Sequence, residues 1–385
     1  MTNQHAVLSA SGADRWIACP PSARQEEHVE DEQSQYAAEG SFAHELAELY
    51  LSLHLDQIKK ATFTKKHKKL QANEFYSQDM ENHVKTYVDY CIEKINEARA
   101  HTRDAEILLE MRLDFSTWVP GGFGTGDLVL ISDNTLEVVD LKYGMGVPVS
   151  AENNSQMRLY ALGAVDQFDM LYNIKKVNMT IHQPRLDNIS TDKMDLDDLF
   201  KWANMTVMGA ADKAWRGVGD FNPGDHCRFC KIRATCRARA QANLELAKYD
   251  FKEPPLLTDD EIVDVLDKAD ELQKWASDVQ AYALDQAVNN NKEWPGWKLV
   301  EGRSVRKYVD EQRVLETLVS EGYEENKITT KQLLGITAME KVLGKKKFND
   351  VLADYVEKPP GKLKLAPAED KRQAVKNKAE VDFKN

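Results

Sequence analysis

Two short runs near the middle of the chain contain residue types that can bind a metal ion and act on a phosphate. The first reads Gly-Thr-Gly-Asp and ends at Asp127, and the second ends in Asp140-Leu141-Lys142. Side chains alternate along a strand, so Asp140 and Lys142 project from one face and Leu141 from the other. Two carboxylates that converge suit a hard divalent cation, and an ammonium beside them can position a water or a phosphate. The alternative interpretation is an ordinary solvated strand face.

Strands must position these residues. An apolar, β-prone stretch over residues 128–132 follows the first run, and the polar pair Asp133-Asn134 comes before the second. This pattern predicts two strands joined by a tight turn. Residues 107–111 predict a third strand beside them, and residues 177–183 predict a fourth. Glu110 is either a further site residue or an ordinary residue of the third strand.

Two predicted helices add polar residues. Residues 152–165 predict a helix on which Gln156 and Tyr160 share a face, because they are four positions apart. A second helix opens near Glu39 and carries His44. For Gln156 and Tyr160 the alternative is a plain polar helix surface, and a lone helical histidine is more often a surface residue than a ligand.

The five cysteines are unevenly distributed, and their odd number argues against a disulfide framework. Cys227, Cys230 and Cys236 form a C-x2-C-x5-C pattern, which can bind a metal centre but is one thiolate short of a tetrahedral or cubane site. Cys19 is the best candidate for the fourth ligand, whereas helical periodicity predicts that Cys91 is buried as a small hydrophobe. The spacing leaves zinc and an iron–sulfur cluster open, and unligated core thiols are the remaining alternative.

The bulk composition describes a soluble globular protein. The 385 residues are 42% hydrophobic and 30% charged, and no apolar run approaches the roughly 18 residues of a membrane span. Residues 1–11 lack the pattern of a secretory signal, so we expect a cytoplasmic location and no membrane partner. The net charge of −12 argues against binding nucleic acid over the whole surface. Basic clusters near 59–69, 228–239 and 345–347 are either a local positive track or solvated surface.

In chain order, these motifs resemble those of the RecB-type branch of the PD-(D/E)XK nucleases over about residues 8–240. They are similar to the iron–sulfur members of that branch, the CRISPR-associated exonucleases and the AddB-type helicase-nucleases. The surrounding phrases resemble an uncharacterised, largely phage and prophage family, which the segments 294–304 and 358–362 also resemble. One departure from the pattern is that Gly126, and no proline, precedes Asp127.

The resemblance implies roles for individual residues. The ligands of a catalytic Mg²⁺ or Mn²⁺ would be Asp127, Asp140, the backbone carbonyl of Leu141 and His44. The histidine favours Mn²⁺ over Mg²⁺. Lys142 would orient the attacking water and stabilise the transition-state charge. Gln156 and Tyr160 would complete the catalytic set by holding their helix against Lys142. The resemblance also favours a structural 4Fe–4S cluster over zinc, on Cys19, Cys227, Cys230 and Cys236.

The expected fold class is α/β, a PD-(D/E)XK restriction-endonuclease-like core with a mixed central sheet flanked by helices. A helical N-terminal part, containing a mobile basic stretch near 59–72, would precede the sheet. Residues 1–250 would form the nuclease domain with the cysteines, 256–365 a mostly helical C-terminal domain with a small α+β extension, and 366–385 a flexible tail. A capping box at Thr258 predicts a long helix to about residue 289.

The expected function is a metal-dependent DNA exonuclease that hydrolyses phosphodiester bonds at single-stranded or duplex DNA ends. The resemblance favours 5′→3′ polarity and a role in phage replication or recombination. A recombinase, a single-strand-binding protein or a helicase would be the partner. Two alternatives from other classes are a non-catalytic DNA-end-binding adaptor and a zinc-stabilised nucleic-acid-binding module without a nuclease site.

Overall fold

The computed structural model describes residues 6–29, 35–245 and 257–297, together with positions 316, 319, 320, 344 and 347. Contacts divide the chain into two units, residues 1–283 and 284–385. The sheet, the predicted site residues and the cysteines all belong to the first unit. The elements predicted beyond residue 297 and the predicted tail at 366–385 lie outside the described residues. The predicted domain boundaries stay predictions.

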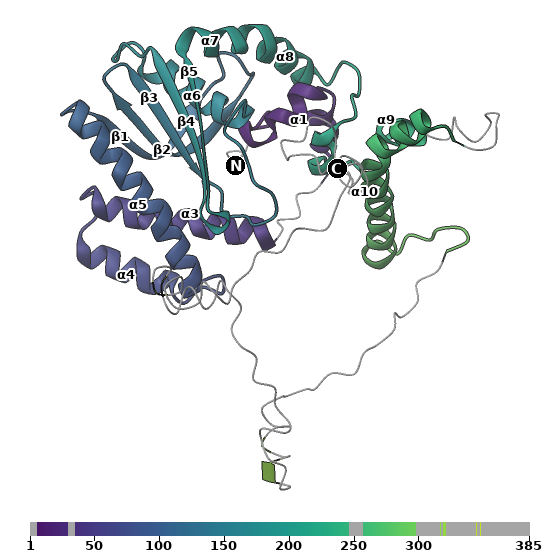
Figure 1. Ribbon diagram of the computed structural model, residues 1–385, viewed down its shortest axis with the longest axis horizontal. Coiled ribbons are helices and arrows are strands. Elements are labelled where there is room, and N and C mark those ends of the chain that lie inside the picture. The colour runs from purple at the N-terminus through teal and green to yellow at the C-terminus, as the bar shows by residue number, and fades with distance from the viewer. Residues whose placement is uncertain are drawn as a thin grey trace, which may run out of the picture. The chain divides into compact units, whose positions relative to one another are not determined.

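A five-stranded mixed sheet forms the centre of the first unit (Figure 1). Its strands are β1 (Glu106–Asp114), β2 (Phe123–Ser132), β3 (Thr135–Leu141), β4 (Lys176–Gln183) and β5 (Asn188–Asp195), in that spatial order. Neighbours are antiparallel except β3 and β4, which are parallel. The parallel pair is joined through helix α6 (Ser155–Phe168). The four predicted strands and the predicted hairpin are confirmed.

Strand β5 (Asn188–Asp195) is a fifth strand that was not predicted from the sequence. The helix α7 (Leu196–Trp202) begins only after the strand. Half-buried and exposed residues alternate along β5, but Ser190 and Asp192 are among the half-buried ones. Because both faces carry polar side chains, the hydrophobic period that signals a strand is missing, and backbone pairing with β4 decides the conformation.

Helices cover both faces of the sheet (Figure 1). The helices of one face are α1 (Ala13–Ala18), α2 (Ser22–Glu26), α6, α7 and α8 (Met208–Arg216). The helices of the other are α3 (Gln35–His54), α4 (Lys60–Leu70) and α5 (Gln78–His101). Each face of the sheet has its own hydrophobic core: the first lies under α1, α2, α6, α7 and α8, and the second under α3, α4 and α5. Because side chains alternate along β3, Val138 packs in the first core, and Val139 and Leu141 pack in the second. This is the arrangement expected of a mixed sheet flanked by helices.

The basic segment predicted to be mobile is the helix α4. Phe63 and His67 are one helical turn apart, and both rings contact Tyr50 of α3, at centroid distances of 5.2 and 5.7 Å. Leu70, one further turn along, is buried. The apolar face of α4 therefore packs on α3, which the many lysines between these residues concealed in the sequence.

The long helix predicted from the capping box is α10 (Asp259–Asn289). Thr258 Oγ1 accepts a hydrogen bond from Glu261 N, and Glu261 Oε2 accepts one from Thr258 N, so the predicted cap is confirmed.

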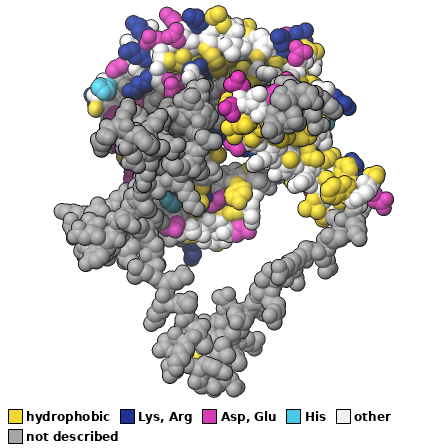
Figure 2. All heavy atoms as spheres, turned by 45° about the vertical axis from the view of Figure 1, so that its right-hand side comes forward, with side chains coloured by type: hydrophobic (Ala, Val, Ile, Leu, Met, Phe, Trp, Pro, Cys, Tyr) yellow, Lys and Arg dark blue, Asp and Glu magenta, His cyan; other side chains and the backbone are white. Residues whose placement is uncertain are grey.

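Basic and acidic side chains are interspersed over the surface drawn in Figure 2. Among the described residues, no helix has the length and apolar character that a membrane span requires.

Candidate functional site

Three side chains that can bind a metal ion converge where α3 meets the first two strands. One ligand atom each of His44, Glu110 and Asp127 lies within 4.8 Å of the other two. His44 Nδ1 is 3.0 Å from Asp127 Oδ1. Within the described part of the chain, this is the one group of three histidine, cysteine or carboxylate side chains with that spacing. An imidazole and two carboxylates form a donor set that can hold a divalent metal ion.

A kink in β1 brings Glu110 to this group. Leu109 pairs with Leu128 and Met111 with Gly126, so Glu110 stands opposite Asp127, and its backbone is left-handed with φ of 46°. Leu109 packs in the second core but Met111 in the first, so the alternation of β1 shifts by one residue at Glu110. Non-glycine residues in this region of backbone space are strained and concentrate at functional sites.

A chain of hydrogen bonds joins Asp127 to the other predicted site residues. Asp127 Oδ2 accepts a hydrogen bond of 2.6 Å from the backbone N–H of Leu141. Asp140 and Lys142 are the two neighbours of Leu141 in the chain. Asp140 is 3% exposed, and its Oδ2 lies 3.0 Å from Lys142 Nζ. Lys142 Nζ also donates to Gln156 Oε1 at 2.9 Å. The predicted strand faces are confirmed, and the carbonyl of Leu141 as a ligand stays a prediction.

Gln156 holds the other end of this chain. Its Nε2 donates to Tyr160 Oη at 3.0 Å and lies 3.4 Å from Asp140 Oδ1. The predicted shared face of Gln156 and Tyr160 on α6 is therefore confirmed. The amide thus accepts from the ammonium of Lys142 and donates to Asp140, which fixes the position of both charged groups.

The pKa values report an excess of negative charge at this site. Burial, with Asp127 second, raises the pKa of Glu110 to about 7. Burial also raises the pKa of Asp140, although Lys142 opposes the shift. For His44, burial alone would lower the pKa, but the adjacent carboxylates, Asp127 foremost, raise it to about 9. Crowded carboxylates with little solvent favour any bound cation, so a divalent metal ion would relieve the repulsion.

Packing against Tyr160 explains why the first residue of the Gly-Thr-Gly-Asp run, Gly124, is a glycine. A Cβ built on Gly124 would lie 2.5 Å from Cε1 of Tyr160, which is closer than carbon atoms approach. We expect Gly124→Ala to displace the Tyr160 ring and to lower the free energy of unfolding by about 1–3 kcal/mol, measured by urea denaturation.

The matched control for this change is Gly209→Ala. A Cβ on Gly209, within α8, meets no atom within 4 Å, so alanine there should leave stability unchanged or raise it by up to about 1 kcal/mol. Equal effects of the two substitutions would contradict a packing role for Gly124.

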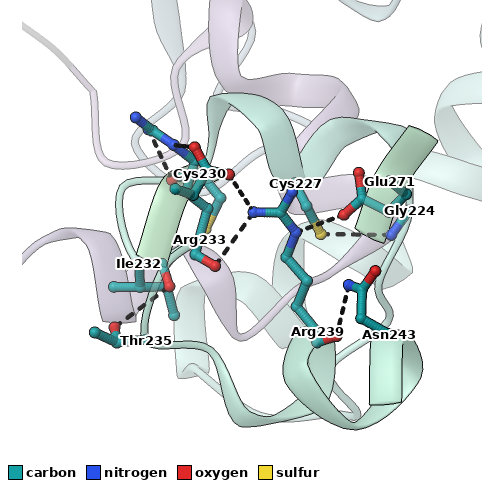
Figure 3. Close-up of polar contacts among 10 residues, drawn as sticks. Gly224, Cys227, Cys230, Ile232, Arg233, Thr235, Arg239, Asn243 and Glu271 are labelled. Carbon is teal, nitrogen blue, oxygen red and sulfur yellow. Dashed lines mark hydrogen bonds and ion pairs between the residues drawn. The ribbon is translucent and has the colours of Figure 1, made fainter. Parts of the chain in front are cut away.

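Four cysteines from distant parts of the sequence line a second site. Cys19 follows α1, and Cys227, Cys230 and Cys236 follow α8; all four line one cavity (Figure 3 shows Cys227 and Cys230). Burial raises the pKa of the Cys230 thiol to about 12, with Glu26 adding to the shift. Burial likewise raises the pKa of Cys19 and of Cys227. The fifth, Cys91, is buried in α5 as predicted.

The four cysteines line one cavity without forming a compact ligand group among the described residues. Zn–S bonds of about 2.3 Å in a tetrahedron place all four sulfurs within about 4 Å of each other. Among the described residues, no cysteine belongs to a group of three ligand atoms within 4.8 Å. The described residues therefore show no assembled metal-ligand arrangement of these cysteines, and zinc and an iron–sulfur cluster both stay open.

Together these features define an α/β protein with a five-stranded mixed sheet and a His–Glu–Asp group at a kink in its first strand. The chain belongs to the DUF2800 family of proteins of unknown function, whose model matches residues 5–373. A solved structure titled "Crystal structure of SSO0001" matches 59% of this chain and 96% of its own, at 14% sequence identity and a TM-score of 0.22. A likeness that weak carries no argument about fold or function.

Proposed function

We propose that the protein is a metal-dependent deoxyribonuclease of the PD-(D/E)XK type, which hydrolyses phosphodiester bonds at DNA ends. The observation that carries the proposal is the connected site: the ligand group of His44, Glu110 and Asp127, joined through Leu141 N to Asp140 and Lys142. A mixed sheet flanked by helices is also the architecture expected of such a core, and it supports the assignment.

The residues divide into two functional sets. His44, Glu110 and Asp127, with Asp140 behind them, would hold Mg²⁺ or Mn²⁺. A bound cation of this kind neutralises non-bridging phosphate oxygens and lowers the pKa of a coordinated water. Lys142 Nζ has three N–H donors. Two of them face Asp140 and Gln156, and the third is left for the attacking water or a phosphate oxygen.

Positioning of that ammonium is the role we assign to α6. Gln156 accepts from Lys142 Nζ and is itself held by Tyr160 Oη. The side chain of Lys142 remains 29% exposed, so a substrate phosphate can reach it. The ammonium then opposes the negative charge that develops in the transition state. The proposed polarity is 5′→3′, which rests on the resemblance alone.

We also propose a structural 4Fe–4S cluster at the four-cysteine cavity. The convergence of Cys19 on the three later cysteines at one cavity supports it, and the resemblance favours this cluster over zinc. The cluster would tie residues near 19 to those near 230. Such a group needs thiolates, so its binding would displace the protons that burial keeps on the free thiols.

The test is digestion of single-stranded and duplex DNA, labelled at either the 5′ or the 3′ end, with Mn²⁺ or Mg²⁺. Anaerobically purified full-length protein should shorten the DNA in the presence of metal, and chelation should stop the reaction. The label released first gives the polarity. If the protein binds DNA ends but never cuts them with either metal, the non-catalytic adaptor becomes the better explanation.

The exposed lysines of α4 give a separate prediction about DNA binding. Lys65 and Lys68 are exposed and have no ion pair among the described residues. Tyr50, which α4 contacts, lies about 9 Å along the α3 axis from His44. We expect Lys65→Gln/Lys68→Gln to weaken DNA binding and to reduce the slope of log K against log[salt] by up to about 1.8 on duplex DNA, about 0.9 for each phosphate that a lysine no longer neutralises.

The control must change the net charge equally at another place. Lys175 and Lys176 are exposed at the start of β4. Lys142 follows the last residue of β3, which is parallel to β4, so these two lysines lie at the end of the strand pair away from the proposed site. Lys175→Gln/Lys176→Gln should leave the salt slope unchanged. An equal reduction of the slope in the two double variants would indicate a general charge effect and remove α4 from the DNA-binding surface.

A further inference from the structure

A buried arginine lies beside the four-cysteine cavity. Arg239, on α9 (Arg237–Leu244), is only 1% exposed, yet its side chain lines the cavity with the four cysteines. Figure 3 shows its guanidinium next to Cys227. Burying a guanidinium costs several kcal/mol unless its charge and its N–H groups are matched by partners, so each of its nitrogens requires an explanation.

Two of the three nitrogens have carboxylate partners on α10. Arg239 Nε donates to Glu271 Oε1 at 2.6 Å, and Nη1 donates to Asp278 Oδ2 at 2.6 Å. The third nitrogen, Nη2, is buried and has no hydrogen-bond partner among the described residues. A buried donor without an acceptor costs about 1–3 kcal/mol, and such groups are rare in folded proteins.

The other charged groups of the cavity are already paired. Arg15 binds Glu26 at 2.8 Å, and Arg233 Nε donates to Asp278 Oδ1 at 2.9 Å. Arg239 Nη2 is the buried guanidinium nitrogen of this cavity without a partner among the described residues; Ser22 Oγ and His226 Nε2, which line the same cavity, are neutral groups that also lack one. Thiolates and the sulfides of an iron–sulfur cluster are anionic acceptors, and hydrogen bonds to these sulfurs stabilise such clusters.

We propose that Arg239 donates from Nη2 to a sulfur of the cluster and, through Glu271 and Asp278, makes the packing of α10 depend on the cluster. Arg239 is a positioning residue in this inference, which rests on the proposed cofactor and not on the nuclease reaction. Without the cluster, Arg239 Nη2 would be a buried donor that has no acceptor. Movement of Arg239 out of its buried position would remove this unfavourable free energy.

The way in which α10 is attached explains why its packing would depend on Arg239. The helix buries none of its described residues completely, although Leu272, Trp275 and Val279 are half-buried. Its contacts with the cysteine region include the ion pairs of Arg239 with Glu271 and Asp278 and that of Arg233 with Asp278. A helix without a fully buried apolar side chain opens at low free-energy cost when its ion pairs are lost, and amide hydrogen exchange detects such opening.

The first experiment needs no mutation. Amide hydrogen exchange over residues 259–283 is compared between the full-length protein purified anaerobically and the same protein after iron is removed by a chelator. We expect exchange there to be at least about tenfold faster in the metal-free protein, while the β2 and β3 amides stay protected. Equal exchange of α10 in the two forms would overturn the inference.

Variants then assign the effect to Arg239. Arg239→Gln should lose iron to a chelator about tenfold faster than wild type, the equivalent of one charge-assisted hydrogen bond. The matched control is Arg237→Gln, on the same helix with the same change of charge, because Arg237 is exposed. Glu271→Gln keeps the donor to the cluster, so it should speed exchange in α10 without speeding iron loss. Equal rates of iron loss in Arg239→Gln and Arg237→Gln would refute the role.

The result also separates this inference from the proposed reaction. Protein that carries no iron when purified anaerobically would refute both the cluster and the role of Arg239. Metal-dependent cleavage of DNA by that same preparation would leave the proposed nuclease intact. Conversely, an iron-loaded protein that cuts no DNA would leave Arg239 testable by its effect on iron loss and on exchange in α10.

Discussion

Asp140→Asn is expected to lower metal-dependent DNA cleavage by about 10³-fold, the size of effect seen when a group that stabilises transition-state charge is removed. Asparagine keeps the size of the side chain and an oxygen for the hydrogen bond from Gln156. It removes the negative charge that faces Lys142 Nζ at 3.0 Å and that would face the cation. The measurement is the single-turnover rate of shortening of end-labelled DNA at saturating Mn²⁺.

The control for this prediction lies on the same strand. Glu137 is three residues earlier on β3 and is half-buried on the opposite side of the sheet from Asp140. Glu137→Gln should therefore keep the cleavage rate within about twofold. Binding of DNA by Asp140→Asn is measured in parallel, because a variant that no longer binds reports on folding or affinity. A variant that binds normally and retains a tenth or more of the wild-type rate would contradict the assigned role.

Of the single substitutions that we propose, Glu81→Gln is expected to lower the free energy of unfolding most. Glu81, on α5, is 4% exposed. Its carboxylate accepts hydrogen bonds from Tyr50 and Tyr76 and pairs with Lys85 Nζ at 2.7 Å. Burial opposes ionisation, but Lys85 and the two tyrosines lower the pKa of Glu81 from 4.5 to about 2. A shift of that size corresponds to about 3 kcal/mol of stability.

The pH dependence of the difference follows from the sign of that shift. A carboxyl group with a lowered pKa stabilises the folded state fully above its unfolded pKa of 4.5 and loses that contribution as pH falls toward about 2. The gap in unfolding free energy between wild type and Glu81→Gln should therefore be widest near pH 6–7 and narrow below pH 4. Urea denaturation across this range measures it.

An exposed glutamate on the same helix serves as the reference. Glu93 is exposed on α5, and Glu93→Gln should change the free energy of unfolding by less than about 0.5 kcal/mol at every pH. If the two variants differ from wild type by the same amount, the cluster around Glu81 does not stabilise the fold.

Most of the candidate site was predictable because it follows simple periodicities. Alternation along β3 placed Asp140 and Lys142 on one face, and the four-residue spacing on α6 placed Gln156 beside Tyr160. These rules need only local geometry. The interpretation of α4 failed for the opposite reason, since a helix rich in lysine conceals an apolar stripe as narrow as Phe63, His67 and Leu70.

Glu110 and β5 depend on the rest of the sheet and could not be fixed locally. Glu110 was left open because a charged residue in an apolar run fits a site residue and an ordinary strand residue equally well, and its left-handed backbone cannot be read from the sequence. Its signal in the sequence was a single charge inside the apolar run 107–111. β5 carries polar residues on both faces, so its conformation depends on pairing with β4, whose position the sequence of β5 does not encode.

The left-handed backbone at Glu110 has a consequence for how the protein distributes its stability. Such a conformation costs about 1–3 kcal/mol for a residue with a side chain, whereas glycine adopts it without steric cost. A chain selected only for a stable sheet would carry glycine at position 110. The glutamate that stands there gives up folding free energy at one point, and networks such as that of Glu81 offset the loss elsewhere.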